Sequence, residues 1–300
     1  MDLTRRDFLK GAAAVAAALG CELPGVRRVQ RALGAGDDAG LPVVWLQGQS
    51  CSGCSISLMN SIEYGSIRDL LVETLDLEFH RTLMAASGDL AVSAAEDAYE
   101  AGGYALIVEG SIPLGAGGRY CMLWPEMTAL DGVRRFARRA SFVIGVGTCG
   151  AYGGLVAGAP NPTRARGLGT RFAGKTVINI PGCPSHPDWI VGTVGHLIAH
   201  GSAPKLDRYG RPEMFYGQQV HRRCPRRGTP AAHTLSDSGC LRHLGCKGPW
   251  ARADCPVRRW NAAESGEAGV NWCVGAGSPC YGCTEPTFPD RMSPFYDLEA

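Results

Sequence analysis

Five short runs rich in apolar and β-branched residues alternate with helical patterns between residues 41 and 200. The runs are LPVVWLQG (41–48), LDLEFH (75–80), YALIVEG (104–110), SFVIGVG (141–147) and KTVINIPG (175–182). Helical patterns lie between them, near 55–71, 93–102, 126–139 and 187–200. Because strands that alternate with helices form parallel sheets covered on both faces, this region predicts an α/β fold with a doubly wound parallel sheet.

The pattern changes near residue 210. The rest of the chain is dense in glycine, proline, arginine and cysteine and has little periodicity. Such a segment buries little apolar area per residue, so we expect bound metal to hold it together. The predicted organisation is a signal at 1–34, a sheet domain at 35–210 and a small irregular domain at 211–300.

The chain begins with MDLTRRDFLKGAAAVAAALG, which joins a basic start to a short apolar run. Paired arginines before such a run are typical of a twin-arginine export signal, and the run is too short to span a bilayer. Small residues at Ala32 and Gly34 offer a cleavage site near residue 34. The sequence thus predicts a periplasmic protein; the alternative is an amphipathic first helix of the mature fold.

Charge excludes some partners. Residues 1–34 hold six of the 30 basic and three of the 28 acidic residues, which leaves 24 and 25 in the mature chain. A chain so close to neutral gives no electrostatic reason to bind nucleic acid or an anionic membrane. No later run is long or apolar enough for a transmembrane helix, so membrane association would require a partner.

Thirteen cysteines in an exported chain would ordinarily indicate disulfides. The twin-arginine route, however, carries proteins that are already folded, often with cofactors inserted in the reducing cytoplasm. Metal ligands are therefore the preferred interpretation of these thiols.

A first set of cysteines follows the strands. Cys51 and Cys54 come directly after the first run, Cys149 after the fourth and Cys183 after the fifth. Ligands of open α/β sheets bind at the carboxyl ends of the strands, so these four thiols are expected to converge. Four thiolates suit an iron-sulfur cube or a structural zinc. A redox Cys-X-X-Cys is the alternative for the first pair, but it leaves Cys149 and Cys183 unexplained.

The stretch from Gly145 to Gly150 also matches the G-x-G-x-x-G fingerprint of dinucleotide-binding proteins. No acidic residue lies between Asp131 and Asp188, so the carboxylate that would bind the ribose is missing. The cysteine in this loop is followed by AYGG rather than by a clear helical pattern. We therefore expect a turn shaped around a metal.

Two more sets of four lie in the last ninety residues. The second set, in HRRC (221–224) and CLRHLGCKGP (240–249), is His221, Cys224, Cys240 and Cys246. His233 and His243 compete by position, and the HxxC spacing favours His221. The third set, which includes the stretch NWCVGAGSPCYGC, is Cys255, Cys273, Cys280 and Cys283. Only Cys21 and Cys121 are left over.

Together these motifs resemble the small subunit of a nickel-iron hydrogenase. The matching stretches are CSGCS (51–55), VEGSIP (108–113), GTCGAYGG (147–154), NPT (161–163), PGCP (181–184), HRRCPR, CLRHLGCKGP, CPVRRWN, NWCV, CYGCTEPTFPD and PFY, in the family's order. The resemblance implies a flavodoxin-like domain, an iron-sulfur domain and a catalytic large subunit as partner in a heterodimeric hydrogenase. This chain has none of the paired cysteine motifs that hold nickel and iron.

The resemblance also implies three iron-sulfur clusters that pass electrons between the large subunit and an external acceptor, either a c-type cytochrome or a membrane cytochrome b. The first set would hold the proximal cluster and the second the distal cluster. Cys255, Cys280 and Cys283 would hold the medial cluster. Many members have proline where this chain has Cys273, so we expect three 4Fe-4S clusters here, or a medial 3Fe-4S cluster if Cys273 is not a ligand.

Oxygen-tolerant members carry two extra cysteines where this chain has Gly53 and Gly154, so an ordinary proximal cubane and oxygen sensitivity are expected. Two alternatives stay open. The related subunit of a quinone-reducing complex should lack the distal set and the signal, and a zinc-stabilised secreted binding module would be colourless. The run HRRCPRR is either a solvated face or the exit where an acceptor docks.

Overall fold

The computed structural model describes residues 41–61, 75–260 and 270–292. The export signal at 1–34 and part of the helix expected at 55–71 lie outside the described residues. Among the described residues, no helix combines the length and the apolar character needed to cross a membrane.

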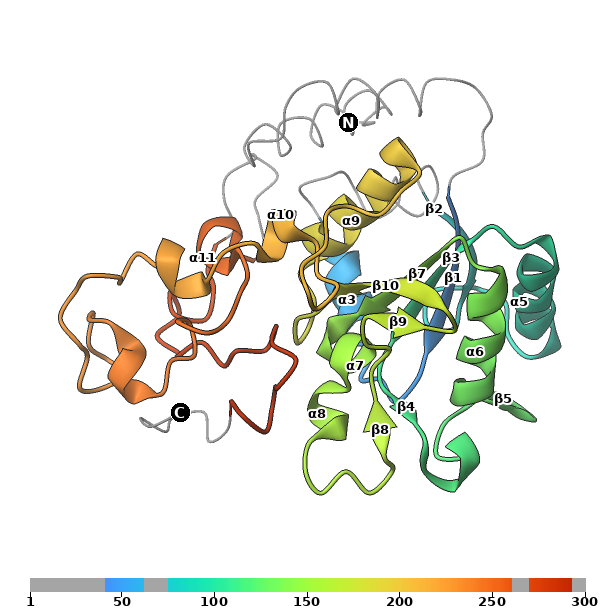
Figure 1. The fold of residues 1–300 in the computed structure, drawn as a ribbon, viewed down its shortest axis with the longest axis horizontal. Helices are drawn as coiled ribbons and strands as arrows, with labels where there is room; N and C mark the ends of the chain where they lie inside the picture. Colours follow the sequence, from blue (N-terminus) through green and yellow to red (C-terminus); the bar gives the residue numbers. More distant parts are fainter. Residues whose placement is uncertain (1–40, 62–74, 261–269, 293–300) are drawn as a thin grey trace.

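A six-stranded sheet forms the centre of the larger region, in the order β2-β1-β3-β7-β10-β9 (Figure 1). Five strands are parallel: β1 (Leu41–Gln47), β2 (Leu75–His80), β3 (Ala105–Glu109), β7 (Phe142–Val146) and β10 (Lys175–Ile180). Numbered among themselves, they follow the order 2-1-3-4-5 of flavodoxin-like sheets. The predicted α/β fold with five parallel strands is confirmed. An antiparallel edge strand, β9 (Arg171–Phe172), was not predicted.

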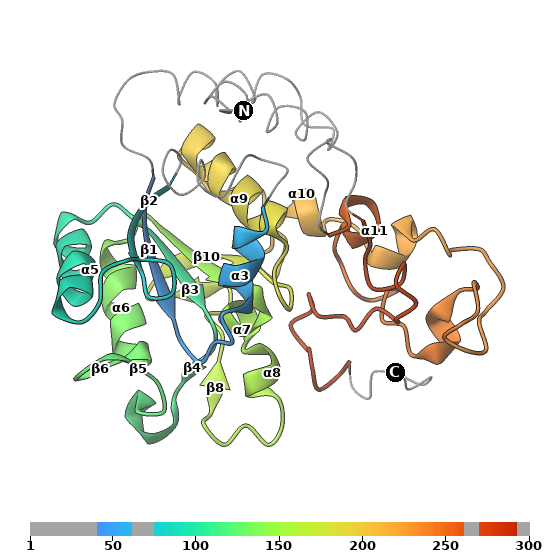
Figure 2. The same cartoon turned by 180° about the vertical axis from the view of Figure 1, so that it is seen from behind.

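Four helices cover the sheet on both faces (Figure 2). They are α3 (Gly53–Met59), α5 (Asp89–Ala101), α6 (Ala129–Arg139) and α9 (Pro187–His200). Thr128 caps the start of α6, because its hydroxyl accepts the N–H of Asp131. α9 carries a proline at its first position. Both features are typical of helix starts.

The core lies on the two faces of the sheet. Trp45, Ile107 and Ile144 pair across β1, β3 and β7 and pack with α3 and α9 on one face. The alternate residues of the same strands, such as Leu106 and Val143, pack with α5 and α6 on the other face. Successive strand residues point to opposite faces, so near-continuous apolar runs are what a sheet buried on both sides requires.

Short elements fill the connections. They are β4 (Ile112–Pro113), η2 (Gly115–Gly118), β5 (Met122–Trp124), β6 (Met127–Thr128), α7 (Gly147–Tyr152), α8 (Gly154–Ala157) and β8 (Ala165–Arg166). The turn expected after the fourth strand is therefore wrong in detail: residues 147–152 form one short helix, and α8 follows.

The remaining chain has little regular structure. Its elements are α10 (Glu213–Tyr216), η3 (Val220–Arg223), η4 (Leu241–Leu244) and α11 (Cys255–Arg258), each of four residues. Figures 1 and 2 show this part beside the sheet domain, on the side where α9 lies. Buried ion pairs link it to α9, because Arg258 contacts both Asp188 and Asp254 at 2.9 and 2.8 Å.

Candidate functional site

The carboxyl edge of the sheet carries the first set of cysteines. Cys51 and Cys54 flank the start of α3, Cys149 lies in α7 directly after β7, and Cys183 follows β10. Burial, followed by the nearby Cys149 and Cys51, raises the pKa of the Cys183 thiol to about 11. Burial likewise raises the pKa of Cys54, with Glu109, Cys149 and Cys183 adding to the effect. The structure thus brings together the four thiols that the strand ends predicted.

Two glycines leave room beside these sulfurs. A Cβ at Gly147 would lie 2.5 Å from Cys54 Sγ, and a Cβ at Gly154 would lie 2.7 Å from Cys149 Sγ. Both residues have positive φ, so a side chain at either position would be strained as well as too close. This backbone therefore has no space for an added side chain at position 154.

Glu109 is a buried acid that the sequence analysis did not single out. Its carboxylate accepts the backbone N–H groups of Cys54 at 3.0 Å and Ser55 at 3.3 Å. It also accepts Gln47 Nε2 and Trp45 Nε1, each at 3.1 Å. An acidic residue that ends the apolar run YALIVEG at the carboxyl edge was the available signal. Glu109 fixes the start of α3, which carries Cys54, and places an acidic side chain beside it.

The second set lies in the C-terminal region. Burial raises the pKa of the Cys224 thiol, and the nearby Cys246 and Cys240 raise it further. His221 donates its backbone N–H to Gly248 O at 2.9 Å, and a Cβ on Gly248 would lie 3.5 Å from Cys246 Sγ. The structure thus places His221 and Cys246 beside Gly248, and the thiol of Cys224 near those of Cys246 and Cys240. His233 and His243 are exposed.

The third set lines a cavity of about 280 Å³. Its walls are Cys255, Cys273, Cys280 and Cys283, with Cys183 of the first set and apolar residues that include Trp272 and Phe288. Burial raises the pKa of Cys255 and of Cys280 well above the usual range, and their neighbouring thiols add to it. Residue Cys273 is exposed, although its side chain reaches this cavity. All four predicted members of the set therefore meet at one hollow.

Contacts join the three sets into one row. Cys183 of the first set lines the same cavity as Cys283 of the third. The backbone N–H of Cys280 donates to Cys246 Sγ at 3.3 Å, which connects the third set to the second. The third set therefore lies between the other two.

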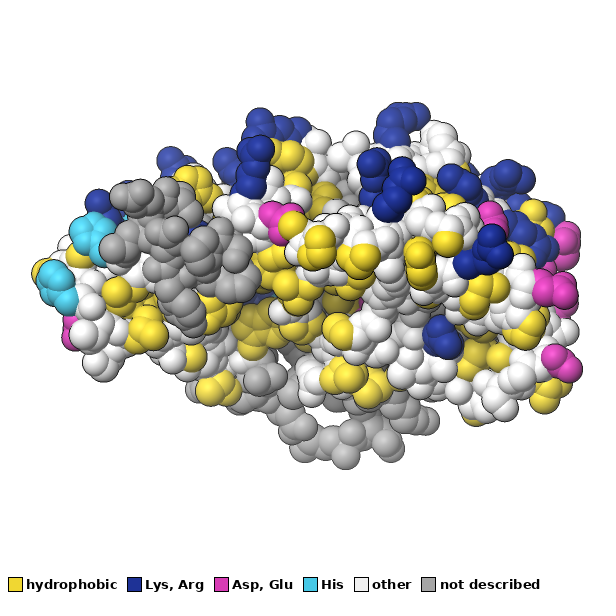
Figure 3. All heavy atoms as spheres, turned by 90° about the horizontal axis from the view of Figure 1, so that it is seen from below, with side chains coloured by type: hydrophobic (Ala, Val, Ile, Leu, Met, Phe, Trp, Pro, Cys, Tyr) yellow, Lys and Arg dark blue, Asp and Glu magenta, His cyan; other side chains and the backbone are white. Residues whose placement is uncertain are grey.

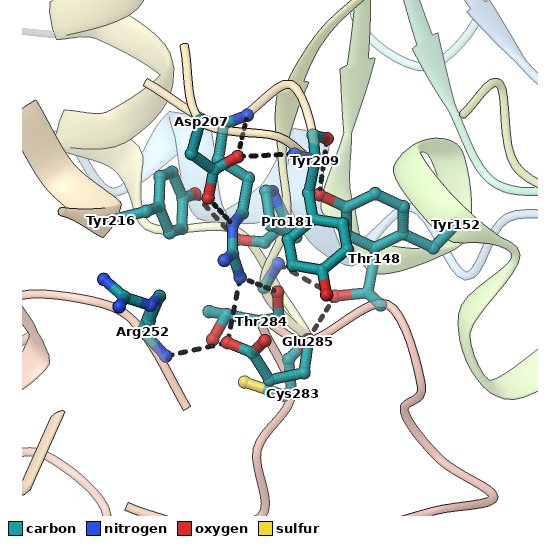
Figure 4. Close-up of polar contacts among 12 residues, drawn as sticks. Thr148, Tyr152, Pro181, Asp207, Tyr209, Tyr216, Arg252, Cys283, Thr284 and Glu285 are labelled. Carbon is teal, nitrogen blue, oxygen red and sulfur yellow. Dashed lines mark hydrogen bonds and ion pairs between the residues drawn. The ribbon is translucent and has the colours of Figure 1, made fainter. Parts of the chain in front are cut away.

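A polar network fixes the segment around Cys283 against the sheet domain (Figure 4). The Thr148 hydroxyl accepts the N–H of Gly182 at 2.9 Å and donates to the carbonyl of Cys283. The guanidinium of Arg211, which has no exposed surface, contacts Asp207 and Glu285, each at 2.8 Å. It also donates to Thr284 O at 3.1 Å. Neither Thr148 nor Arg211 is apparent from the sequence, because their partners lie up to 135 residues away.

The donor atoms suit iron-sulfur chemistry. Eleven thiols and one imidazole in three sets of four are the ligand types found on such clusters. Within the described residues, no three His, Cys, Asp or Glu side chains converge as they would on a single metal ion. Burial raises the pKa of thiols such as Cys54, Cys183 and Cys255, so cluster binding would release protons from them. Cys121 packs at the edge of the core under α5 and α6, away from the three sets.

Comparisons with known proteins agree with this geometry. The family model "NADH ubiquinone oxidoreductase, 20 Kd subunit" matches residues 51–197. The model for the C-terminal part of NiFe/NiFeSe hydrogenase small subunits matches residues 216–296, and the twin-arginine signal model matches residues 2–20. The first description also covers the quinone-reducing alternative, so the C-terminal match and the signal are what separate the two.

Full-length relatives are hydrogenase small subunits. The periplasmic NiFeSe hydrogenase small subunit of Desulfomicrobium baculatum is 39% identical over 100% of both chains. The periplasmic NiFe hydrogenase small subunit of Solidesulfovibrio fructosivorans is 40% identical over 98% of this chain and 93% of its own. A crystal structure of the Desulfomicrobium baculatum enzyme, in a reduced, active form, matches with a TM-score of 0.80 at 39% identity, covering 86% of this chain and 99% of that one. The chain is exported by the twin-arginine route to the periplasm, and it belongs to the family of nickel-iron hydrogenase small subunits.

Proposed function

We propose that the chain passes electrons between the H2-activating site of a large subunit and an external acceptor through three iron-sulfur clusters. When bound, the clusters would supply one-electron relay sites. The proximal set would be Cys51, Cys54, Cys149 and Cys183, and the distal set His221, Cys224, Cys240 and Cys246. The observation that carries the proposal is the cavity lined by all four members of the third set, with contacts to the first set on one side and the second on the other.

The medial set is proposed to include Cys273 beside Cys255, Cys280 and Cys283. A fourth iron requires a fourth thiolate, and Cys273 reaches the same cavity as the other three. The alternative is that Cys273 acts as a small apolar side chain buried in the core. Cys273 is exposed, which argues against that role. All three clusters are therefore proposed to be 4Fe-4S.

The proximal cluster is proposed to be an ordinary cubane. Two extra cysteine ligands would need to stand at Gly53 and Gly154, and a Cβ at position 154 would press on Cys149 Sγ. We accordingly expect the enzyme to be inactivated by oxygen.

As a hydrogenase small subunit, the chain pairs with a large subunit. We infer that the partner covers the carboxyl edge of the sheet, because large apolar side chains are exposed beside the proximal set. Ile56 and Met59 of α3 and Leu155 of α8 have 52%, 43% and 54% of their surface exposed. Figure 3 shows apolar side chains gathered over the middle of the lower face. Exposed apolar patches of this kind are typical of protein interfaces.

The domain boundaries proposed are 35–210 for the flavodoxin-like domain with the proximal set and 211–300 for the iron-sulfur domain with the other two sets. The acceptor would be a c-type cytochrome or a membrane cytochrome b, which would also explain any membrane association. Nucleic acid is not expected as a partner.

The test is anaerobic co-purification of the chain with its large subunit from the native host, followed by metal analysis and an H2-uptake assay. We expect about twelve iron atoms and as many acid-labile sulfides in this chain, four for each cubane. Expressed alone, the chain should be insoluble or poor in iron, because the edge that carries the proximal set is then open to solvent. A zinc-loaded, colourless protein, or a soluble monomer with its full iron, would contradict the proposal.

A further inference from the structure

We infer that the surface around the distal set is a docking site for a redox protein with an acidic face. The inference rests on the proposed function, since it takes electron exit at His221, Cys224, Cys240 and Cys246 as given. It adds the charge of the partner, which the cluster assignment leaves open.

Basic residues are concentrated in this part of the chain. Residues 211–260 contain ten arginines and lysines against three acidic residues, although the mature chain as a whole has 24 against 25. The positive charge is therefore local and does not reflect the composition of the chain.

Part of this charge is neutralised by buried carboxylates. Arg211 pairs with Asp207 and Glu285, and Arg258 pairs with Asp188 and Asp254. Five other arginines are exposed and form no ion pair with any described residue. Four of them are close in sequence to members of the second set, namely Arg222, Arg223, Arg227 and Arg242, and the fifth is Arg252.

The one acidic residue between positions 214 and 253, Asp237, is occupied within its own loop. Its carboxylate accepts the backbone N–H groups of His233 and Thr234 at 2.8 and 2.9 Å, and the Thr234 hydroxyl at 2.9 Å. No described carboxylate is therefore left in this segment to cancel the four exposed arginines near the second set.

These arginines lie around the predicted exit residue. Arg222 and Arg223 directly follow His221 in η3, and Arg242 is in η4, which begins after Cys240. Arg227 lies against the same turn, because its backbone N–H donates to Cys224 O at 3.0 Å and its guanidinium donates to Arg222 O at 3.5 Å. Exposed positive charge thus lies on η3 and η4, the two elements that hold or adjoin His221, Cys224 and Cys240.

An acidic carrier protein fits this surface better than an anionic membrane does. Both would be attracted electrostatically, but only an electron carrier has to be held next to the distal set, because it must accept electrons there. Opposite charges raise association rates by about 10- to 1,000-fold at low ionic strength, and salt removes the effect. A carrier with a basic face would be repelled.

The test compares one c-type cytochrome that carries a basic lysine surface with the same protein after succinylation of its lysines. The two share fold and haem and differ in surface charge. Binding of each oxidised cytochrome to the complete heterodimer is measured without H2, so that no turnover is involved. H2-dependent reduction of each is then measured and divided by the H2/D2 exchange rate of the same preparation.

We expect the succinylated form to bind at least about tenfold more tightly at low salt, and the difference to disappear at high salt. The double variant Arg222→Glu, Arg242→Glu should abolish or invert this preference. The matched control, Arg134→Glu with Arg138→Glu, changes the net charge equally at two exposed positions of α6 and should behave as the unmodified enzyme does.

Equal binding of the two cytochromes, or a preference that survives in the Arg222, Arg242 variant, would overturn the inference. A membrane contact would be identified instead if the enzyme prefers neither cytochrome but sediments with phosphatidylglycerol vesicles in a way that depends on the arginines. That result would also overturn the inference. If H2 still reduces a small dye in either case, electron transfer by this chain stands and only the acidic partner is wrong. A protein without iron and without dye reduction would remove both proposals.

Discussion

Between Leu41 and His200, parallel strands bury their side chains on two faces under long helices, whereas between Gly217 and Met292 no described helical element exceeds four residues. One apolar core cluster belongs to the first region alone. The other is shared, because nine buried residues of the second region, among them Leu241 and Trp272, pack into it beside α9. Buried apolar area can stabilise the first region alone. The second must depend on its polar anchors and on whatever its thiols bind.

The largest expected effect comes from removing iron from the anaerobically purified heterodimer with an oxidant and a chelator. The second region should lose its folded structure, because bound metal stabilises it in place of an apolar core of its own. Hydrogen exchange measured by mass spectrometry should show loss of amide protection over 217–292, with β1, β3 and β7 still protected. Simultaneous loss in both regions would mean that they do not differ in this way.

The next largest effect concerns the seam between the regions. Arg211→Met removes the cation from Asp207 and Glu285, which leaves two carboxylates unpaired in a buried site. Breaking a buried pair costs about 3–5 kcal/mol, so thermal unfolding of the second region should shift strongly downward. Arg208→Met, a change at an exposed neighbour, is the control and should have little effect. An unshifted midpoint in Arg211→Met would show that the seam is held elsewhere.

A third effect belongs to the sheet region alone. Burial lowers the pKa of His80 from about 6.5 to about 4, so the folded protein keeps this imidazole neutral where the unfolded chain protonates it. The stabilisation is complete above pH 6.5 and is lost as the pH falls toward 4, by at most about 3 kcal/mol. Hydrogen exchange of β1 and β2 at pH 7 and pH 5 measures it. His80→Gln should remove most of the difference, and an unchanged pH dependence would exclude His80 as its cause.

The two regions also differ in how far sequence predicts them. Strand runs such as YALIVEG are readable because side-chain burial on two faces leaves a local pattern, and cysteine positions after the strands follow from that pattern. The network of Thr148, Arg211 and Glu285 has no local pattern, since its contacts with the C-terminal segment join residues 73 to 135 positions apart. The cavity shared by Cys183 and Cys283 likewise depends on how the C-terminal chain folds back onto the sheet.

A smaller effect is expected at the distal set. Imidazole is neutral where thiolate is anionic, so His221 should keep the distal potential higher than four thiolates would. His221→Cys should slow reduction of an external dye severalfold and leave H2/D2 exchange nearly intact. His243→Cys, at an exposed position of η4, is the matched control. Equal loss of both activities in His221→Cys would mean that the residue acts only on the fold.

The smallest change separates ligand from scaffold inside the second region. Cys273→Pro removes one thiol from the cavity and leaves Cys255, Cys280 and Cys283 in place, which are enough to hold three irons. A three-iron cluster would still bridge the first and second sets, so the variant should still transfer electrons. Its oxidised form should gain the EPR signal of a 3Fe-4S cluster, with a raised medial potential, because cluster type and net charge set the potential. Cys121→Ala, which removes a thiol outside the three sets, should give no such signal. If the unmodified enzyme, prepared without oxygen, already has one 3Fe-4S cluster per molecule, Cys273 is not a ligand, and the cavity holds its cluster with three cysteines alone.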